Sequence, residues 1–108
     1  MKYMVISHFK DSFWMLTREN QTEKISLAAS VYEKFFKSGK LLEFYYLCDM
    51  KGAVTIWDLA SPEEFVRICL DNPLTTFMDD KFVPLIERDA VNNILKEKCA
   101  GAKKKGAK

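Results

Sequence analysis

The sequence has few of the residues that metal and nucleophilic chemistry require. It contains one histidine and three cysteines, and the cysteines at positions 48, 69 and 99 form no CxxC pair. The sequence therefore predicts neither a disulfide framework nor a zinc site. It also lacks a glycine-rich phosphate loop and a Ser-His-Asp pattern, so we expect no cofactor and no metal. Cys48 and Cys69 are expected to be small buried residues of the core, because free cysteine behaves as a buried apolar residue.

Long apolar runs and a basic folded surface are also missing. No apolar run approaches the roughly 18 residues that span a bilayer, and the chain starts with strand-like sequence instead of a signal peptide. The 17 Lys and Arg side chains exceed the 15 Asp and Glu side chains by two. This small excess lies in the final segment, where four lysines occur in residues 103–108. We therefore expect neither a membrane nor a nucleic-acid partner, and a cytoplasmic location.

Apolar material for one core is present. Hydrophobic residues make up 48% of the 108 residues and aromatic residues 13%, which suits a single domain. We expect residues 1–98 to form this domain. Residues 99–108 are basic and of low complexity, and we expect them to be disordered.

Segments rich in β-branched and aromatic residues predict four strands. These segments are residues 2–9, 40–48, 53–59 and 80–86. Apolar residues at steps of three and four predict a helix that starts near residue 17 or 22 and ends at Ser38. Ser61, Pro62 and Glu64 form a capping signal for a second helix, and Asp89 can cap a third that ends near Lys98.

Between the first strand and the first helix, Phe13, Trp14, Met15 and Leu16 form a compact apolar segment after a polar turn. We expect a loop or short helical turn that covers one end of the sheet. Two interpretations remain open for it. The segment is either a hydrophobic plug, or a lid in which Trp14 lines a ligand pocket.

The order of these elements predicts the fold class. The order β-α-β-β-α-β is typical of an α+β ferredoxin-like sandwich, with a four-stranded antiparallel sheet and both helices on one face. The C-terminal helix is an addition to it. Met4, Ile6, Tyr45 and Trp57 would make the other face too apolar for water. We therefore expect a homodimer in which two sheets close into a barrel with an interior.

Residues 38–87 also carry a series of motifs in a fixed order. These are a Gly-Lys strand start, an aromatic-Asp-aliphatic strand end, a Ser-led helix, a Leu- and Met-Asp-containing turn, and a Pro-Leu strand end. The residues are Gly39, Lys40, Trp57, Asp58, Leu59, Ser61, Glu64, Pro73, Leu74, Met78, Asp79, Pro84 and Leu85. The series resembles the muconolactone isomerase family of small dimeric α/β-barrel proteins. The resemblance implies the dimeric barrel and a small aromatic-derived, lactone or other enolisable ligand, and it leaves open whether the dimers assemble into larger rings.

The sequence departs from the family pattern at positions that bear on chemistry. Family enzymes have a Trp-Arg pair where this chain has Tyr45 and Tyr46, so a cationic partner for a lactone carboxylate is missing. Ala53 replaces an Asn, and Lys81 replaces an acidic residue. We therefore expect a different small-molecule ligand in the same barrel.

Strand alternation, combined with the family pattern, predicts which side chains face the barrel interior. His8 or Glu43 is the expected acid/base group, and Tyr45 the expected hydrogen-bond donor to a developing enolate. The expected ligand contacts are Met4, Ile6, Trp14, Thr55, Trp57 and Lys81.

Each of these site assignments has an alternative. His8 could be a solvated residue at a strand end, Glu43 could form an ion pair with Lys81, and Tyr45 and Trp57 could belong to the dimer core. Two functions from different classes are accordingly open. The dimer is either a cofactor-free isomerase or cyclase, or a non-catalytic ligand-binding or assembly module whose barrel is filled by side chains.

Overall fold

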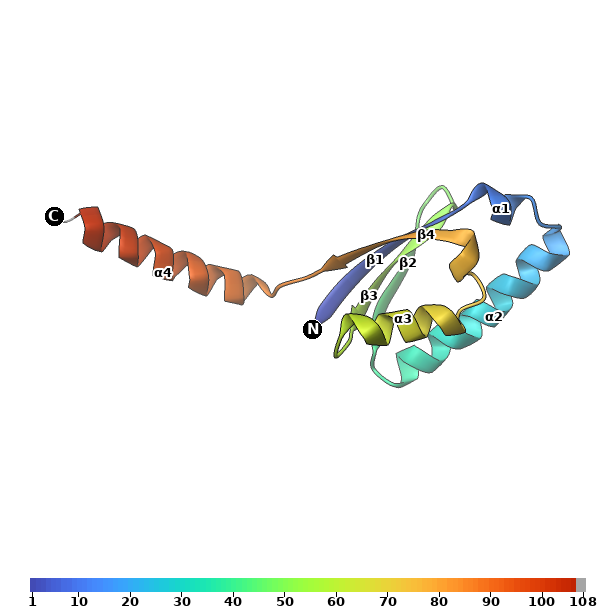
Figure 1. Cartoon of the computed structure of the whole chain (residues 1–108), viewed down its shortest axis with the longest axis horizontal. Coiled ribbons are helices and arrows are strands. Elements are labelled where there is room, and N and C mark those ends of the chain that lie inside the picture. The colour runs from blue at the N-terminus through green and yellow to red at the C-terminus, as the bar shows by residue number, and fades with distance from the viewer. Residues whose placement is uncertain (107–108) are drawn as a thin grey trace.

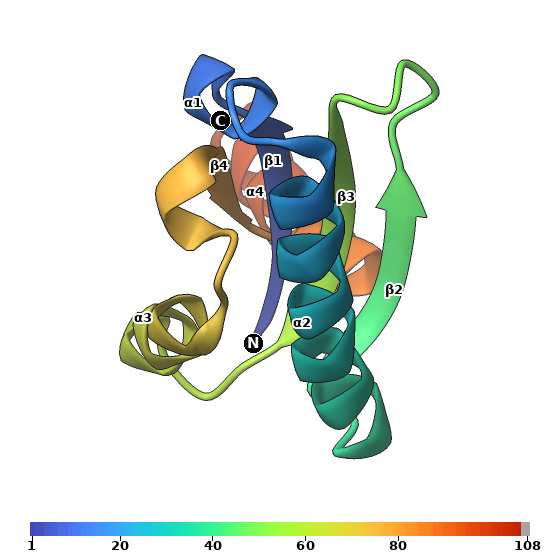
Figure 2. The same ribbon diagram turned by 90° about the vertical axis from the view of Figure 1, so that its right-hand side faces the viewer.

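Four antiparallel strands form one sheet in the order β2-β3-β1-β4 (Figures 1 and 2). The computed structural model describes the backbone of residues 1–106 and the side chains of residues 1–101. The strands are β1 (Lys2–Phe9), β2 (Leu41–Tyr46), β3 (Gly52–Asp58) and β4 (Met78–Pro84). The α+β class, the βαββαβ order and the added C-terminal helix predicted from the sequence are confirmed.

Two helices, α2 (Arg18–Lys37) and α3 (Pro62–Asp71), cover one face of the sheet (Figure 2). Two shorter elements, α1 (Asp11–Trp14) and η1 (Thr75–Phe77), lie near the end of the sheet where β1 finishes. The last helix, α4 (Arg88–Gly106), projects away from the body, which gives the molecule extents of 71 × 28 × 22 Å (Figure 1). Within the described residues, no helix combines the length and the apolarity that a membrane span requires.

Local sequence signals set the ends of these helices. The Thr17 hydroxyl accepts a hydrogen bond from the Asn20 N–H at 3.1 Å and starts α2, and Gly39 follows α2 with a φ of 77°. The Ser61 hydroxyl accepts from the Glu64 N–H, while the Glu64 carboxylate accepts from the Ala60 N–H at 2.9 Å. The capping signal at Ser61 therefore marks a real helix start. The cap predicted at Asp89 is wrong, because α4 already begins at Arg88 and Asp89 lies in its first turn.

Some predicted boundaries are wrong by a few residues. β2 ends at Tyr46 because Leu47 already belongs to the turn, which places Cys48 on the surface and not in the core as predicted. β4 starts at Met78, since Met78 pairs with Phe9 of β1. α4 ends at Gly106 and not near Lys98 as predicted. Disorder of residues 99–108 stays a prediction, and Ala107 and Lys108 lie outside the described residues.

The core lies between the sheet and the two helices. Trp57 is 2% exposed and sits at its centre, with its indole N–H donating to the Thr55 hydroxyl at 2.7 Å. Its ring packs edge-on against the rings of Phe35 and Phe65. A second buried cluster, made by Phe13, Ala28, Leu74 and Met78, lies toward the α1 end of the sheet.

The strand register assigns each side chain to one face of the sheet. Tyr3, Val5 and Ser7 of β1 pair with Trp57, Thr55 and Ala53 of β3, and all six are buried under the helices. The opposite face, which we call the outer sheet face, carries apolar side chains that are only half-buried at its centre. These are Met4, Ile6, Val54, Ile56 and Val83.

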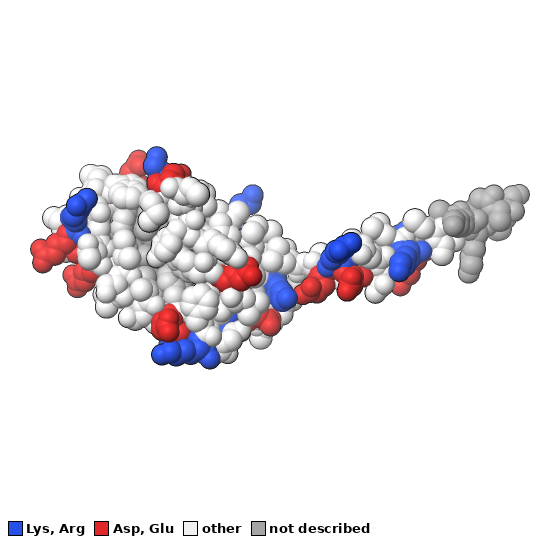
Figure 3. Space-filling view, turned by 180° about the vertical axis from the view of Figure 1, so that it is seen from behind, with Lys and Arg blue, Asp and Glu red and all other residues white. Residues whose placement is uncertain are grey.

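Charged side chains are sparse over the middle of one face of the body (Figure 3). Seen from behind the view of Figure 1, the body shows mainly uncharged atoms, with charged groups near its rim and along α4 (Figure 3). The exposed apolar surface includes Tyr45 of the outer sheet face, which is 57% exposed. Apolar surface of this kind marks a site of interaction.

Candidate functional site

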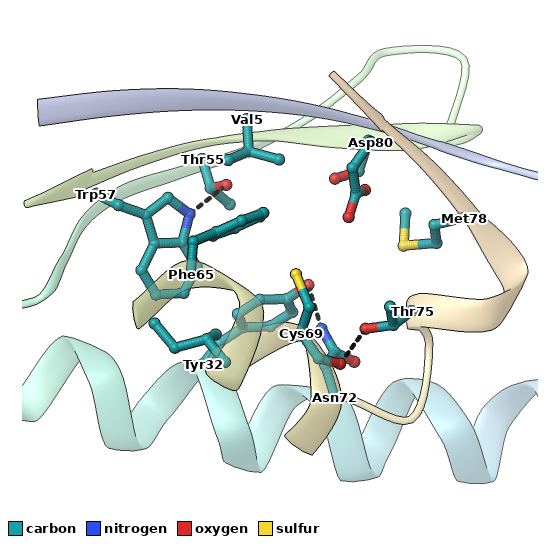
Figure 4. Close-up of a pocket in the computed structure, with 12 residues that line it drawn as sticks. Val5, Tyr32, Thr55, Trp57, Phe65, Cys69, Asn72, Thr75, Met78 and Asp80 are labelled. Atoms are coloured by element: carbon teal, nitrogen blue, oxygen red, sulfur yellow. Dashed lines mark hydrogen bonds between the residues drawn. The ribbon is translucent and has the colours of Figure 1, made fainter. Parts of the chain in front are cut away.

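Two neighbouring cavities lie on the helix-covered side of the sheet. The first, which we call the polar pocket, has a volume of about 20 Å³ and lies between the sheet, α3 and η1 (Figure 4). The second, which we call the apolar groove, has a volume of about 310 Å³ and lies between α2 and the β2–β3 hairpin. Tyr32 and Met78 line both cavities, so the two adjoin.

Hydrogen bonds organise the wall of the polar pocket. The Asn72 side-chain N–H donates to the Tyr32 hydroxyl at 3.0 Å, and the Thr75 hydroxyl donates to the Cys69 carbonyl (Figure 4). The Asn72 side-chain oxygen also accepts from the Leu74 N–H at 2.9 Å, which fixes the turn after α3. The turn that ends α3 thus also orients the Asn72 side chain toward Tyr32.

Burial keeps two ionisable groups of the polar pocket protonated at neutral pH. Burial raises the pKa of the Tyr32 hydroxyl, against the opposing effect of its hydrogen bond with Asn72. Burial also raises the pKa of the Cys69 thiol to about 11, so this thiol is not a nucleophile near neutral pH. Asp80 of β4 supplies a carboxylate, which Figure 4 shows directed into the pocket. The pocket therefore combines one acidic side chain with the neutral Tyr32 hydroxyl and Cys69 thiol.

Six aromatic side chains line the apolar groove. Phe9 and Phe13 stack with ring centroids 4.0 Å apart, and Trp14 packs edge-on against both. The polar side-chain groups of the lining are the Gln21 amide, two tyrosine hydroxyls and the Trp14 indole N–H. The full lining is Phe9, Phe13, Trp14, Gln21, Ile25, Ala28, Ala29, Tyr32, Phe44, Tyr46, Met50, Gly52, Ala53, Leu74 and Met78.

Small residues create the space of the groove. Ala28 and Ala29 occupy the α2 side, while Gly52 and Ala53 occupy the β3 side. Gly52 has no alternative there, because a Cβ atom at this position would lie 1.9 Å from the Ser7 carbonyl oxygen. The absence of a side chain at Gly52 thus allows β3 to approach β1 closely and leaves open volume beside it.

The predicted site residues are divided between the two faces of the sheet. Met4, Ile6, His8, Glu43, Tyr45 and Lys81 lie on the outer sheet face. Thr55 and Trp57 lie on the opposite, helix-covered face, so their predicted place beside Met4 and Ile6 is wrong. Trp14 lines the apolar groove while its neighbour Phe13 is buried at 1% exposure, so the segment has features of both a plug and a pocket wall.

The register also separates the predicted acid/base pair. His8 pairs with Gly52 and Glu43 pairs with Ile56, four positions apart on β3, which corresponds to about 13 Å along the strand. The alternative ion pair between Glu43 and Lys81 does not form, because β2 and β4 are opposite edges of the sheet, about 14 Å apart. One protomer therefore does not assemble these groups into a single site.

Several cavity residues had no signal as site residues in the sequence. Ala28, Ala29 and Tyr32 belong to the apolar stripe of the predicted helix and read as core. Asn72 follows the end of α3 and Met50 lies in the β2–β3 turn, positions that carry no signal of a binding site. In the part of the chain that the structure describes, no three His, Cys, Asp or Glu side chains come together as metal ligands would.

Comparison with known proteins bears on the fold. No protein-family model matches the chain, and no curated protein sequence matches it either. Muconolactone isomerase superposes with a TM-score of 0.69 at 13% sequence identity, over 82% of this chain and 91% of that chain.

A second solved structure is similar to the same extent. It is 5-chloro-2-hydroxyhydroquinone dehydrochlorinase from Burkholderia phenoliruptrix AC1100 in complex with 2,5-dihydroxybenzoquinone. It superposes with a TM-score of 0.66 at 12% identity, over 83% of this chain and 98% of that chain. The resemblance read from the sequence is thereby confirmed at the level of the fold: this chain has the ferredoxin-like fold of muconolactone isomerase and of this dehydrochlorinase.

Proposed function

We propose that the protein binds a small aromatic or enolisable ring compound in the apolar groove. The observation that carries this proposal is a groove of about 310 Å³ whose walls are almost entirely apolar. A dry cavity of roughly 150 Å³ lined by apolar side chains binds benzene. The groove has about twice that volume, so it suits a ligand of one or two fused rings.

The chemistry of the walls favours an aromatic ligand over an alkyl chain. Phe9, Phe13, Trp14, Phe44 and Tyr46 line the groove, and the pairs Phe9–Trp14 and Phe44–Tyr46 pack edge-on. Aromatic pairs in offset or edge-on geometry contribute about 0.5–1.5 kcal/mol beyond their buried area. The two proteins of the same fold support this choice, since one is named for a lactone and the other is bound to a dihydroxybenzoquinone ring.

A titration with 2-naphthol tests the binding proposal. We expect a Kd between about 10 μM and 1 mM, from the range of ligand efficiencies known for small ligands. Ala29 is exposed on α2 and lines the groove, so Ala29→Phe should fill the groove and weaken binding at least tenfold without loss of stability. Calorimetry measures the affinity, and circular dichroism the stability.

The matched control adds the same bulk outside the groove. Ser30 is the next residue of α2, is exposed and does not line the groove. Ser30→Phe should therefore bind 2-naphthol as the natural protein does. If Ala29→Phe and Ser30→Phe bind equally well, the ligand does not occupy the groove.

A second candidate function is cofactor-free proton transfer next to a carbonyl. The polar pocket favours it, because the Asp80 carboxylate can accept a proton from carbon while the neutral Tyr32 hydroxyl donates to the developing enolate oxygen. Its volume of about 20 Å³ admits one oxygen-sized group beside a ring held in the groove. In this proposal Asp80 and Tyr32 carry the expected isomerase or cyclase chemistry. His8, Glu43 and Tyr45 remain predictions for the interior of a dimer.

Deuterium exchange into 2-tetralone, a two-ring enolisable ketone, distinguishes an enzyme from a binding module. If the polar pocket is catalytic, exchange in D₂O should exceed the buffer rate, and Asp80→Asn should reduce it by about 10²-fold or more, since general base catalysis contributes this much. Asp79→Asn is the control, because Asp79 lies on the outer sheet face. Exchange at the buffer rate with the natural protein would leave only the binding function.

We further propose that the protein forms a homodimer through the outer sheet face. The apolar centre of this face is open to solvent in one protomer, and a second copy would cover it. Ile56→Lys should therefore convert a dimer of about 25 kDa, twice the 12.5 kDa chain, into a monomer in light scattering. The control is Leu70 of α3, which is 79% exposed and lies on the helix-covered side of the sheet. Leu70→Lys should leave the dimer intact. Two results would contradict this interface: a natural protein that is monomeric at tens of micromolar, or an Ile56→Lys protein that still forms a dimer.

A further inference from the structure

Met50 has an unusual backbone conformation at the tip of the β2–β3 hairpin. Its φ is 61°, and among the described residues it is the one non-glycine residue with a positive φ. This left-handed region is costly for residues with a Cβ atom, and Gly or Asn usually occupies it. The chain therefore has a methionine where the backbone conformation favours a glycine.

The hydrogen bonds of the turn do not require the methionine side chain. The Met50 N–H donates to the Leu47 carbonyl at 2.9 Å, and the Lys51 N–H donates to the Asp49 carboxylate at 2.9 Å. The Leu47 N–H donates to the Gly52 carbonyl at 2.9 Å. Each of these bonds uses a backbone group or Asp49, so a glycine at position 50 would keep all of them.

The side chain of Met50 instead lines the apolar groove. It is 61% exposed, which places it at the mouth of the groove and not at its floor. Trp14 of α1, which is 47% exposed, lines the mouth as well. Figure 2 shows α1 and the β2–β3 hairpin at the same end of the sheet, with the start of α2 between them.

We propose that Met50 is a specificity-determining residue of the apolar groove, held at its mouth by the left-handed backbone so that it closes over the outer ring of a two-ring ligand. This inference rests on the proposed binding function. A flexible thioether suits the role, because methionine adapts to irregular shapes and its sulfur contacts aromatic rings favourably. A local backbone conflict of this kind is typical of functional positions.

The proposal predicts a separation between ligands of different length. Met50→Gly should bind 2-naphthol about five- to tenfold more weakly. Its affinity for phenol should change less than twofold, because the single ring of phenol binds deep in the groove and does not reach Met50. Its thermal midpoint should equal or exceed that of the natural protein, because glycine adopts the turn conformation freely. Met50→Leu keeps an apolar side chain of similar size and should keep the affinity for 2-naphthol within about twofold.

NMR titration of the three proteins with both ligands measures these affinities. Equal affinity of Met50→Gly and the natural protein for 2-naphthol, or an equal loss for phenol and 2-naphthol, would overturn the role of Met50 alone. Failure of the natural protein to bind either ligand would overturn the proposed function, and this inference with it.

Discussion

Gly52→Ala is expected to lower the free energy of unfolding by about 2–4 kcal/mol. The added Cβ would lie 1.9 Å from the Ser7 carbonyl oxygen and within 3.1 Å of the His8 Cα, both backbone atoms that cannot move without breaking the β1–β3 ladder. For a domain of this size the thermal midpoint should fall on the order of 10–20 °C. Thermal unfolding followed by circular dichroism measures the shift.

Gly39→Ala is the matched control for the cause of this loss. Gly39 has a φ of 77°, and a Cβ atom added there would have no heavy atom within 4 Å, so alanine meets only the left-handed backbone cost of about 1–2 kcal/mol. Gly52 has no positive φ, so its cost comes from the steric clash alone. A Gly52→Ala protein that is as stable as the natural protein would show that β1 and β3 do not approach as described.

Trp57→Ala is expected to cost about 3–5 kcal/mol of stability, which is a large part of the total for a small domain. Trp57 is 2% exposed, packs against Phe35 and Phe65, and donates to the Thr55 hydroxyl. Its removal leaves a cavity at the centre of the core, and the Thr55 hydroxyl loses its partner. Urea unfolding measures the loss.

The control for Trp57 is the second tryptophan of the chain. Trp14→Ala should cost much less stability, because Trp14 is half-exposed at the mouth of the groove. It should weaken 2-naphthol binding instead. If Trp57→Ala kept full stability and lost ligand affinity, Trp57 would be the ligand contact predicted from the sequence and not a core residue.

The fold could be predicted because its signals are local. Thr17, Gly39 and Ser61 mark helix ends through contacts with residues at most a few positions away. The element order then leaves few topologies that cover one face of a four-stranded sheet. The motif series from Gly39 to Leu85 also consists mainly of caps, turns and strand ends, which explains why it matched the fold.

The faces of β3 could not be predicted in the same way. Val54 and Ile56 alternate with Thr55 and Trp57, so both faces of this strand are largely apolar and alternation cannot choose between them. The choice depends on pairing with Tyr3 and with the helices, which are distant in sequence. The predicted site therefore combined side chains from both faces.

The groove lay beyond sequence reasoning for a related reason. The groove exists because small residues on α2 and β3 leave space between these elements, and these residues come together only in the folded chain. Ala28 has the same apolar pattern as any residue of a helix core. The positive φ of Met50 likewise has no sequence signature, because the turn residues that usually adopt it are Gly and Asn.

The location of the ligand is the most direct test of the proposed function. Methyl-group NMR of the natural protein during titration with 2-naphthol measures it. Binding in the apolar groove should shift the methyl signals of Ala28, Ala29, Ala53 and Met50, which line it. The methyl signals of Met4, Ile6, Val54 and Ile56 on the outer sheet face should stay unchanged. Shifts confined to this second set would contradict the groove as the binding site and place the ligand in the interior of a dimeric barrel.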